Sequence, residues 1–383
     1  MRRVAVIGVG ITKFGKHDRT SAELFAQAAA DAIVDAEIAP SEVQALYYGN
    51  VTGGETEHQL HMGPLAATTL GLPSIPTTRF ETACATSHAA FRHAVMEIAS
   101  GVSDIALVGG AERVLNVPTD AATEYFAYCS DATYEQSLGL TFPGVFALIA
   151  RAHMDRYGTT EEQMAHVAVK NHRHGTLNPK AQFQKEISLE TVLRSPYVAD
   201  PLKLYDCCPF TDGGAAVVLA AEDVARRRRA VWVLATEAAA DTMFIHEKRD
   251  LARVPATERA ALQAYRRAGK TPGEIDVVEL HDCFTIAEIV ATEGLGFFEP
   301  GVGGIAAEKG WTSLGGKIPV NPSGGLKAKG HPIGATGAAQ IGEIVTQLRG
   351  DAGARQVAGA RTGLVHTLGG NTATVLVSLL GRD

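Results

Sequence analysis

The chain has 383 residues, of which 46% are hydrophobic and 20% are charged. This is ordinary globular composition, and the length suffices for two domains with separate cores. The formal net charge of −7 argues against a protein that binds nucleic acid, and no segment reaches the apolar length that a membrane span needs.

Seven apolar runs along the chain predict β-strands. Most are continuous rather than alternating, which is typical of strands buried on both faces of a sheet. The runs span residues 4–7, 105–108, 215–219, 231–235, 277–280, 364–367 and 374–380. Helical patterns lie between them; Thr20 and Glu23, for example, form a capping box before an amphipathic stretch over 24–38. Strands that alternate with helices predict a layered α/β fold.

A weak internal repeat divides the chain. The helix that Cys84 opens ends near Gly101, the helix that follows His331 ends near Gly350, and each helix is followed by a strand and then by a Gly-Gly pair. We therefore predict a duplicated α/β unit with halves at 1–228 and 229–383. The irregular pattern between about 116 and 200, with short helices, predicts an insertion in the first half that lies over the active site.

The cysteines are Cys84, Cys129, Cys207, Cys208 and Cys283, and they include no Cys-x-x-Cys pair. An odd number of cysteines in a large chain disfavours a disulfide framework. We expect a reducing, cytoplasmic compartment, in which free thiols can serve as nucleophiles.

The first candidate for chemistry is Cys84, which stands at the start of an Ala-rich helix. The free N–H groups and the dipole at a helix N-terminus stabilise a thiolate. Taken alone, Cys84 fits either a nucleophile or a buried structural cysteine.

The second candidate is the segment Glu279-Leu-His281-Asp282-Cys283-Phe284, which ends a predicted buried strand. Strand ends are where α/β folds build their sites. His281 and Cys283 are therefore candidate site residues, although a histidine in such a position is often bonded only locally. Asp282 is better explained as a turn residue or a helix N-cap.

The third candidate is the glycine-rich loop 321–330 before His331. Its glycines let the backbone approach a ligand closely, and Lys327 and Lys329 can face phosphates. The loop lacks Walker spacing, and the first strand is not followed by G-x-G-x-x-G, so we predict neither an ATP site nor a dinucleotide site. The cysteine and histidine candidates lie in separate segments without close ligand pairs, and we predict no metal.

These three clusters together resemble the thiolases, and among them the sterol-carrier-protein-x type of bacteria and archaea. The similarity covers nearly the whole chain. His-Asp-Cys-Phe at 281–284 is typical of this subgroup, and Asn-Pro-Ser-Gly-Gly at 321–325 with Gly-His-Pro-Ile-Gly-Ala-Thr-Gly at 330–337 is typical of the wider thiolase branch. The resemblance implies a duplicated five-layer α-β-α-β-α fold in which the insertion is a loop domain.

The resemblance also implies catalytic roles. Cys84 is the nucleophile that carries the acyl group, and His331 activates it and helps to bind the thioester oxygen. His281 completes this oxyanion site, and Cys283 is the second catalytic thiol, which moves the proton on the α-carbon. The backbone N–H groups of Cys84 and Gly369 form a second oxyanion hole for the acyl-enzyme.

The implied substrates are coenzyme A thioesters, with no permanently bound cofactor. The predicted CoA-binding residues are Ser323, Gly324, Lys327 and Lys329. In similar proteins the insertion lines the substrate channel. Its aromatic residues Tyr125, Phe126, Tyr128 and Phe142 are explained equally well by narrowing that channel and by packing.

The sequence departs from the family pattern in two places. Common thiolases carry Cys-x-Gly near the C-terminus, where this chain has His366-Thr-Leu-Gly-Gly, so the work of that cysteine falls to Cys283. Asn371 and Thr372 replace the Gly-Gly of the subgroup, which alters the acyl pocket. Similar proteins without the nucleophile act as retro-aldolases, and the presence of Cys84 weighs against that activity.

The function that the resemblance implies is that of a thiolase, an acetyl-CoA acetyltransferase that acts by Claisen condensation or thiolytic cleavage. The alternatives are C-acetyltransfer to a phloroglucinol-type acceptor and a non-catalytic scaffold subunit. The implied partners are a second copy in a homodimer or tetramer, a hydroxymethylglutaryl-CoA synthase and a small OB-fold zinc-ribbon protein. No nucleic acid or membrane partner is expected.

Overall fold

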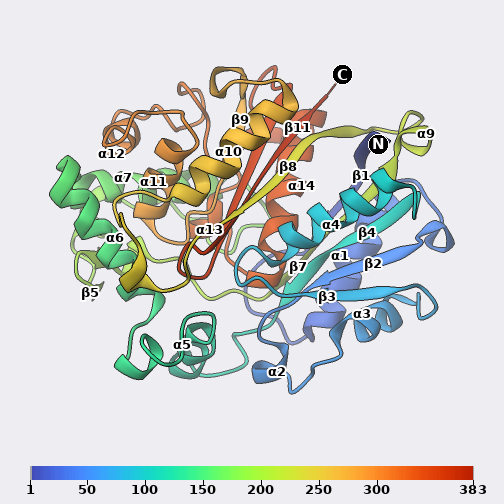
Figure 1. Ribbon diagram of the computed structural model, residues 1–383, viewed down its shortest axis with the longest axis horizontal. Helices are drawn as coiled ribbons and strands as arrows, with labels where there is room; N and C mark the ends of the chain where they lie inside the picture. Colours follow the sequence, from blue (N-terminus) through green and yellow to red (C-terminus); the bar gives the residue numbers. More distant parts are fainter. Residues whose placement is uncertain (1, 383) are drawn as a thin grey trace.

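The computed structural model describes residues 2–382 (Figure 1). Within this range, nine strands form one sheet in the order β3-β2-β4-β7-β1-β8-β11-β10-β9. The first five strands in this order come from the first half of the chain and the last four come from the second half. The strands of the first half are β1 (Val4–Ile11), β2 (Ala45–Gly49), β3 (Thr77–Phe80), β4 (Ile105–Glu112) and β7 (Gly213–Ala221). Those of the second half are β8 (Val231–Ala240), β9 (Val277–Glu279), β10 (Thr362–Gly369) and β11 (Thr374–Gly381).

The two halves pair their strands in the same way. In the first half β7 is antiparallel to β1 and to β4, and β2 is parallel to β4 and to β3. In the second half β11 is antiparallel to β8 and to β10, and β9 is parallel to β10 and, through a bridge from Val278, to Val320. The seam between the halves is the short antiparallel pairing of Ala5 and Val6 on β1 with Trp232 and Val231 on β8. The division at 228 falls just before β8 and stays a prediction.

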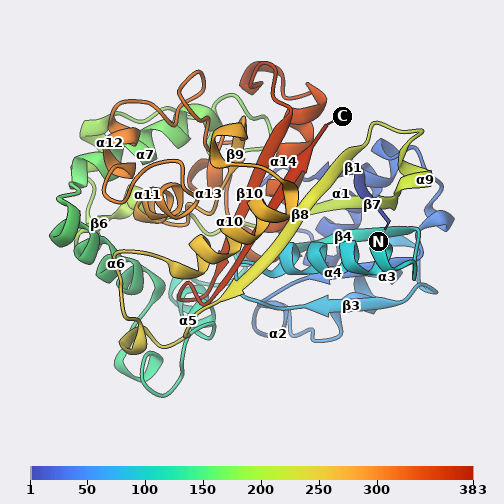
Figure 2. The same cartoon turned by 45° about the horizontal axis from the view of Figure 1, so that its top comes forward.

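Helices cover both halves and separate them. The central layer consists of α4 (Thr86–Ser100) and α14 (Thr336–Arg349), whose apolar faces share one core with strands of both halves. On the outer face of the first half lie α1 (Ser21–Asp35) and α3 (Met62–Leu70). The second half is covered by α10 (Pro255–Ala268) and α11 (Thr285–Gly294). The layers therefore follow the predicted α-β-α-β-α order (Figures 1 and 2).

The local signals set the helix ends as the sequence predicts. The Thr20 hydroxyl accepts from the backbone N–H of Glu23, and the Glu23 carboxylate accepts from the backbone N–H of Thr20, which begins α1 with the predicted capping box. Helices α4 and α14 end at Gly101 and Gly350, which adopt left-handed conformations that glycine enters at little cost. The seven predicted strands are present. Two strands of the sheet are additional: β2, whose short apolar stretch at 45–48 the prediction did not include, and β3, whose residues Thr77 and Arg79 leave no apolar run.

The insertion folds mainly into helices. It contains α5 (Thr119–Ala127), α6 (Phe142–Tyr157), α7 (Glu161–Gly175), α8 (Leu189–Leu193) and the strand β5 (Tyr197–Ala199), which pairs with β6 (Leu202–Lys203). The expectation of short helices alone is wrong, since α6 has 16 residues and α7 has 15. Although it belongs to the first half in sequence, the insertion packs on α11 and α12 (Gly303–Glu308) of the second half, as both views show (Figures 1 and 2).

Membrane-spanning helices are not found: none of the helices between residues 2 and 382 combines the length and the apolar character that a crossing requires.

Candidate active site

Cys84 lies in a tight turn between β3 and α4. Ala83 has a left-handed backbone with φ of 50°, a strained conformation for a residue with a side chain. The Glu81 carboxylate accepts from the Ala83 N–H at 2.6 Å, and the Thr86 hydroxyl donates to the Ala83 carbonyl at 2.6 Å. These bonds hold the thiol in a fixed position, two residues before the first residue of α4.

The Cys84 thiol is protonated at rest. Burial raises its pKa well above that of a free cysteine, and the neighbouring thiols of Cys129 and Cys208 raise it further. The backbone N–H groups of Gly370 and of Cys84 itself lower the pKa, but by less. The expectation of a stabilised thiolate is therefore wrong, because desolvation outweighs the helix N-terminus. The thiol needs a base.

His331 is a candidate base, and its ring has the protonation state that this role needs. Its Nδ1 lies 2.7 Å from the Thr336 hydroxyl, which itself donates to the Pro332 carbonyl at 2.9 Å. Since that hydroxyl has only one proton to give, Nδ1 of His331 must carry the ring proton. Burial lowers the pKa of His331 to about 3, so the ring is neutral and its Nε2 is free to accept a proton.

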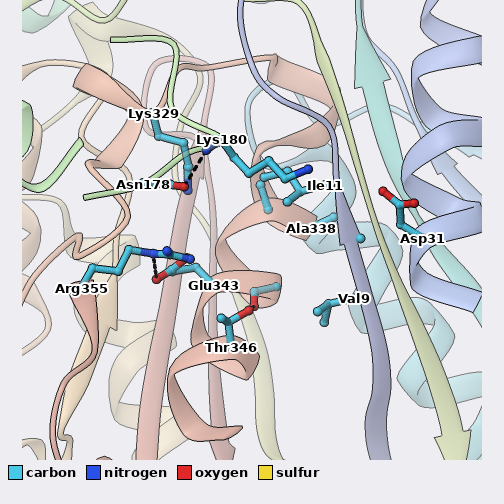
Figure 3. A pocket seen from close by; sticks show the side chains of 13 residues that line it. Val9, Ile11, Asp31, Asn178, Lys180, Lys329, Ala338, Glu343, Thr346 and Arg355 are labelled. Atoms are coloured by element: carbon cyan, nitrogen blue, oxygen red, sulfur yellow. Dashed lines mark hydrogen bonds and ion pairs between the residues drawn. The ribbon is translucent and has the colours of Figure 1, made fainter. Parts of the chain in front are cut away.

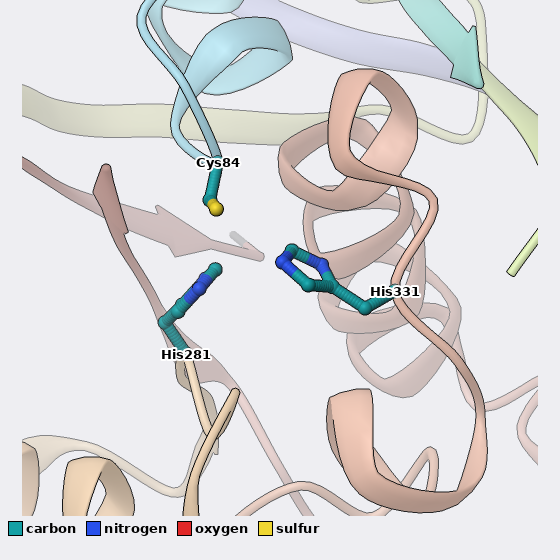
Figure 4. Close-up of side chains that lie close together, drawn as sticks. All are labelled: Cys84, His281 and His331. Atoms are coloured by element: carbon teal, nitrogen blue, oxygen red, sulfur yellow. The ribbon is translucent and has the colours of Figure 1, made fainter. Parts of the chain in front are cut away.

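His281 faces the same point from the end of β9. Its ring centroid lies 5.0 Å from that of His331, with the planes at 81°. A ring nitrogen of each histidine and Sγ of Cys84 lie within 4.8 Å of one another, and Figure 4 shows both rings and the sulfur converging. Within residues 2–382, neither nitrogen of His281 nor Nε2 of His331 has a hydrogen-bond partner. Buried polar atoms without partners are unusual, and here they face the Cys84 sulfur.

These three side chains could also serve as ligands for a soft metal ion. The prediction of no metal stays a prediction.

Cys283 is the second thiol of the site. It is buried, and burial raises the pKa of its thiol well above the usual value, as do the neighbouring Cys208 and Cys84. Its carbonyl accepts from the Cys208 N–H at 2.9 Å, which fixes the backbone. A thiol that holds its proton at rest is suited to donating that proton when a stronger base appears.

Gly369 ends β10 directly against the Cys84 turn. A Cβ at this position would lie 2.4 Å from the carbonyl oxygen of Thr82, so the close approach requires glycine. The N–H that acts on the Cys84 sulfur belongs to Gly370, the next residue. The predicted role of Gly369 in an oxyanion hole stays a prediction.

Two buried carboxylates hold the histidine loops together. Asp282 accepts from the backbone N–H of Leu326 at 2.7 Å and from the side chain of Asn171 at 2.7 Å. The N-cap interpretation of Asp282 is wrong, because Phe284 is the N-cap residue of the next helix, α11, and Gly324 is that of α13 (Gly325–Ala328). Asp282 instead accepts from the first turn of α13 from a distant part of the chain. Glu279 accepts from the Ser323 hydroxyl at 2.7 Å and pairs with Lys329 at 3.2 Å.

Two protein-family models together match almost the whole chain. Residues 4–223 match the thiolase N-terminal domain, and residues 237–382 match the thiolase C-terminal domain-like family. The chain belongs to the thiolase family.

The similar proteins agree with this assignment. The acetyl-CoA acetyltransferase of Methanothermobacter thermautotrophicus is 47% identical over the full length of both chains. Human sterol carrier protein 2 is 37% identical and matches 98% of this chain and 71% of its own. The benzoylsuccinyl-CoA thiolase subunit BbsB of Thauera aromatica is 36% identical over 96% of this chain and 95% of its own. The protein is thus an acyltransferase of the thiolase type.

Solved structures share the fold. The Ltp2-ChsH2(DUF35) aldolase superposes with a TM-score of 0.84 at 26% identity and covers 100% of this chain and 98% of its own. An acetyl-CoA acetyltransferase from Syntrophomonas wolfei has a TM-score of 0.78 at 18% identity over the full length of both chains, a likeness of fold.

Two pockets of this thiolase adjoin the catalytic cluster. One, of about 320 Å³, is lined by Ala83, Gly369 and Gly370 together with Tyr125 and Tyr128 of the insertion. The other predicted aromatic residues pack elsewhere. Phe126 lies against Phe210, with ring centroids 5.2 Å apart, and Phe142 packs on the core of the second half.

The second pocket, of about 340 Å³, leads toward Cys208. It is lined by His172, Phe183, Lys185, Ile187, Leu204, Tyr205, Cys207, Cys208, Pro209 and Lys327.

The predicted CoA-binding residues are separated by the fold. Lys327 lines the pocket beside Cys208. Lys329 lies at the wall of a different pocket, of about 210 Å³, which Figure 3 shows with Glu343 and Arg355. Ser323 bonds to Glu279, and Gly324 begins α13. Their role in binding CoA stays a prediction, and among the four only Lys327 has a side-chain polar atom without a partner within residues 2–382.

Sequence reasoning missed three contributors to the site: Thr336, Cys208 and Gly370. Thr336 stands inside the quoted Gly-Ala-Thr-Gly motif, five residues after His331, so the motif carried a signal that was available. Cys208 and Gly370 act through burial and backbone position, for which the sequence offers no local signal.

Proposed function

We propose that this thiolase makes and breaks the carbon–carbon bond of 3-oxoacyl-CoA through an acyl-enzyme on Cys84, and that its activity is that of an acetyl-CoA acetyltransferase. The observation that carries the proposal is the convergence of two neutral, buried imidazoles on the Cys84 sulfur, with open nitrogens and no other partner within the described chain. The similarity to two archaeal acetyl-CoA acetyltransferases, at 47% and 38% identity, supports the choice of acyl group.

Acylation uses His331 and both thiols. Nε2 of His331 accepts the Cys84 proton as the sulfur attacks the thioester carbonyl. The carbonyl oxygen gains negative charge, which N–H donors beside it stabilise. When the carbon–sulfur bond to CoA breaks, Cys283 gives its proton to the leaving CoA sulfur and becomes a thiolate. Its raised pKa makes Cys283 a strong base from this moment on.

Condensation then returns each proton to its source. The Cys283 thiolate removes a proton from the α-carbon of a second acetyl-CoA, and His281, with a protonated ring nitrogen, stabilises the enolate oxygen. The α-carbon attacks the acyl group on Cys84, whose oxygen lies near the N–H groups of Cys84, Gly369 and Gly370. The Cys84 sulfur leaves and regains its proton from His331. Thiolysis runs through the same steps in reverse.

The pocket beside Cys208 is the proposed entrance for the CoA arm. What supports this is that Cys208, which lines the pocket, influences the pKa of both Cys84 and Cys283. Exposed Lys185 supplies positive charge at its mouth, where the phosphates of CoA would lie.

Turnover assays test this function. We expect thiolysis of acetoacetyl-CoA and condensation of acetyl-CoA by the wild type, and loss of both in Cys84→Ala. Acetylation of a phloroglucinol in place of a second acetyl-CoA would assign the aromatic acceptor instead. An unchanged rate in Cys84→Ala would contradict a catalytic Cys84 and favour a scaffold subunit.

We also propose that the protein works in an assembly. The similar solved structure is described as an Ltp2-ChsH2(DUF35) aldolase, which pairs Ltp2 with a DUF35 protein. By analogy, we propose a homodimer or tetramer that binds a small OB-fold zinc-ribbon protein and a hydroxymethylglutaryl-CoA synthase. Co-purification with tagged candidates tests this. Full activity of a protein that co-elutes with none of them would count against it.

A further inference from the structure

Lys327 is a buried lysine whose amine has no partner. Only 1% of the residue is exposed, and Nζ makes no hydrogen bond within residues 2–382. A buried amine without a partner loses its hydration and gains nothing in return, so such groups are rare unless a ligand completes them. The other buried lysine of this loop, Lys329, is paired with Glu279 at 3.2 Å.

The acids nearest to Lys327 are already engaged. Asp206 accepts from the Thr285 hydroxyl at 2.6 Å and from the Lys203 N–H at 2.8 Å. Asp282 accepts from Asn171 and from the backbone that begins α13. Neither acid forms an ion pair with Lys327 within the described chain, although both influence the pKa of its amine. The partner of the amine must therefore come from the pocket.

The pocket that Lys327 lines combines groups of different kinds. The mouth is formed by Lys185, which is exposed, and by Phe183 and Leu204, whose side chains are about half exposed. His172 stacks on Phe183, with centroids 5.8 Å apart and planes at 16°. The pocket is also lined by Cys208, whose thiol raises the pKa of Cys283. Its lining therefore combines a cation, an apolar wall with one amine, and thiols.

We propose that the Lys327 amine donates a hydrogen bond to an amide oxygen of the pantetheine arm, which makes Lys327 a specificity-determining residue for pantetheine-borne thioesters. In such a thioester the sulfur is followed by a short alkyl link and an amide, and the phosphate lies at the far end of the arm. The pocket lining offers a group for each of these parts: thiols near Cys208, the Lys327 amine and the exposed Lys185. The inference rests on the proposed function, because it takes Cys84 as the acceptor of the acyl group.

A phosphate is the wrong partner for a lysine at this depth. A phosphate group carries more charge than one ammonium balances, and its burial among apolar walls is costly. Burial also lowers the pKa of Lys327, so the neutral form of its amine becomes more favourable. A neutral amine can donate a hydrogen bond to the oxygen of a neutral amide. Lys185, exposed at the mouth, is the residue placed for phosphate.

The test compares acyl donors that keep or lack each feature. The donors are acetyl-CoA, acetyl-pantetheine, S-acetyl-N-acetylcysteamine and S-butyl thioacetate, which has no amide. In Lys327→Met we expect kcat/KM for acylation of Cys84 to fall on the order of ten-fold for the three amide donors, mainly through KM. The rate with S-butyl thioacetate should not change. Lys327→Gln, which keeps an N–H donor, should recover part of the loss.

A matched variant separates the mouth from the interior. Lys185→Met should weaken acetyl-CoA alone, because acetyl-pantetheine and the shorter donors carry no phosphate. Equal loss with all four donors in Lys327→Met, or no loss with any, would overturn the proposal. Because Lys327→Met removes a buried amine without a partner, we expect its melting temperature to equal or exceed that of the wild type.

Two further outcomes distinguish failure of the Lys327 proposal from failure of the proposed function. If acetyl-CoA acylates the wild type but Lys327→Met is unaffected, only the role of Lys327 fails. If acetyl-CoA does not acylate the wild type, the proposed function fails first. An acetylated carrier protein with a phosphopantetheine arm offers the same amide. Dependence on Lys327 with both donors supports the proposal, and the faster donor identifies the natural source.

Discussion

The protonation state of the Cys84 thiol depends on its burial, and the neighbouring His331 is the group proposed to deprotonate it. A thiol at a helix start gains from the dipole, but here desolvation raises its pKa well above the usual value. The thiol is therefore protonated at rest, and in the proposed function His331 would take the proton only when the sulfur attacks. A thiol of this kind would be protected from the side reactions of a free thiolate.

The Thr336 hydroxyl should matter more than its small size suggests. Thr336→Val removes the acceptor that keeps the ring proton of His331 on Nδ1, so Nε2 loses its preference for the basic form. We expect kcat to fall at least roughly ten-fold with little change in KM. Steady-state kinetics of thiolysis would measure this.

Thr346→Val is the control for that change. Thr346 lies on the same helix, and within residues 2–382 its hydroxyl bonds only to the helix carbonyl of Gly342. It should retain wild-type kcat. Equal losses in the two variants would mean that Thr336 acts through helix stability alone.

At the scale of elements, two loops that are distant in sequence meet through carboxylates. Asp282, from the end of β9, accepts from the first turn of α13, and Glu279 holds Ser323 and Lys329 of the same loop. Because His281 and His331 stand at the two sides of this junction, their separation depends on it. We therefore propose that the two carboxylates are positioning residues for the rings of His281 and His331.

Asp282→Asn tests this junction. The amide keeps one acceptor oxygen but turns an N–H₂ group toward backbone donors, which leaves buried groups unsatisfied. We expect a loss of about 1–3 kcal/mol in the free energy of unfolding, together with a lower kcat in the protein that remains folded. Urea unfolding and active-site titration would measure the two effects.

Asp276→Asn is a matched control for this substitution. Asp276 accepts from two backbone N–H groups, those of Arg361 at 2.8 Å and Thr362 at 2.9 Å, at the opposite end of β9 and β10. It should lose stability but keep wild-type kcat per folded molecule. A wild-type kcat in Asp282→Asn as well would remove the positioning role.

The sequence was sufficient for most strands of the sheet, which carry apolar runs, and for helices with clear ends. It missed β3, because a short strand with residues such as Thr77 and Arg79 shows no apolar run. It also missed β2, although the apolar stretch at 45–48 is as long as several runs that were predicted. It further assigned Lys327 and Lys329 to one CoA site, although the two side chains line different pockets. Side-chain direction in the loop depends on left-handed glycines such as Gly324 and Gly325, whose effect local patterns do not reveal.

For the whole molecule, duplication explains why the site forms where it does. The two central helices begin near the same point, so Cys84 before α4 and His331 before α14 are brought together by the repeat. The resemblance to a known family supplied their roles, whereas composition and spacing alone left Cys84 open. The balance of burial and dipole at its thiol required the three-dimensional structure.

The buried histidines predict how stability depends on pH. The pKa falls to about 3 for His88, His174, His331 and His366, to about 4 for His172, and well below the usual value for His281. The unfolded chain protonates these histidines near pH 6.5, while the folded chain does not. Unfolded molecules therefore bind more protons below this pH, and stability falls as the pH falls from 7 to 5.

Three buried carboxyls act in the opposite direction. Burial raises the pKa of Glu112 and Asp282 to about 7 and raises that of Glu279, so they keep protons that the unfolded chain releases. Six histidines outnumber these three groups, and the net effect follows the histidines. Urea midpoints measured at about pH 7, 6 and 5, which span the titration of an ordinary histidine, should decrease in that order. Midpoints that rise toward pH 5 would contradict the neutral, buried state of the rings.

The central claim is that Cys84 carries the acyl group, and the mass of the isolated acyl-enzyme tests it most directly. The protein would be incubated with acetyl-CoA, quenched in acid and digested, and the peptide that contains Cys84 would be weighed. We expect a gain of one acetyl group on Cys84 in the wild type, a reduced rate of gain in His331→Asn and no gain in Cys84→Ala. An acetyl group on Cys283 or Cys208 instead, or an unmodified protein that still turns over substrate, would contradict the claim.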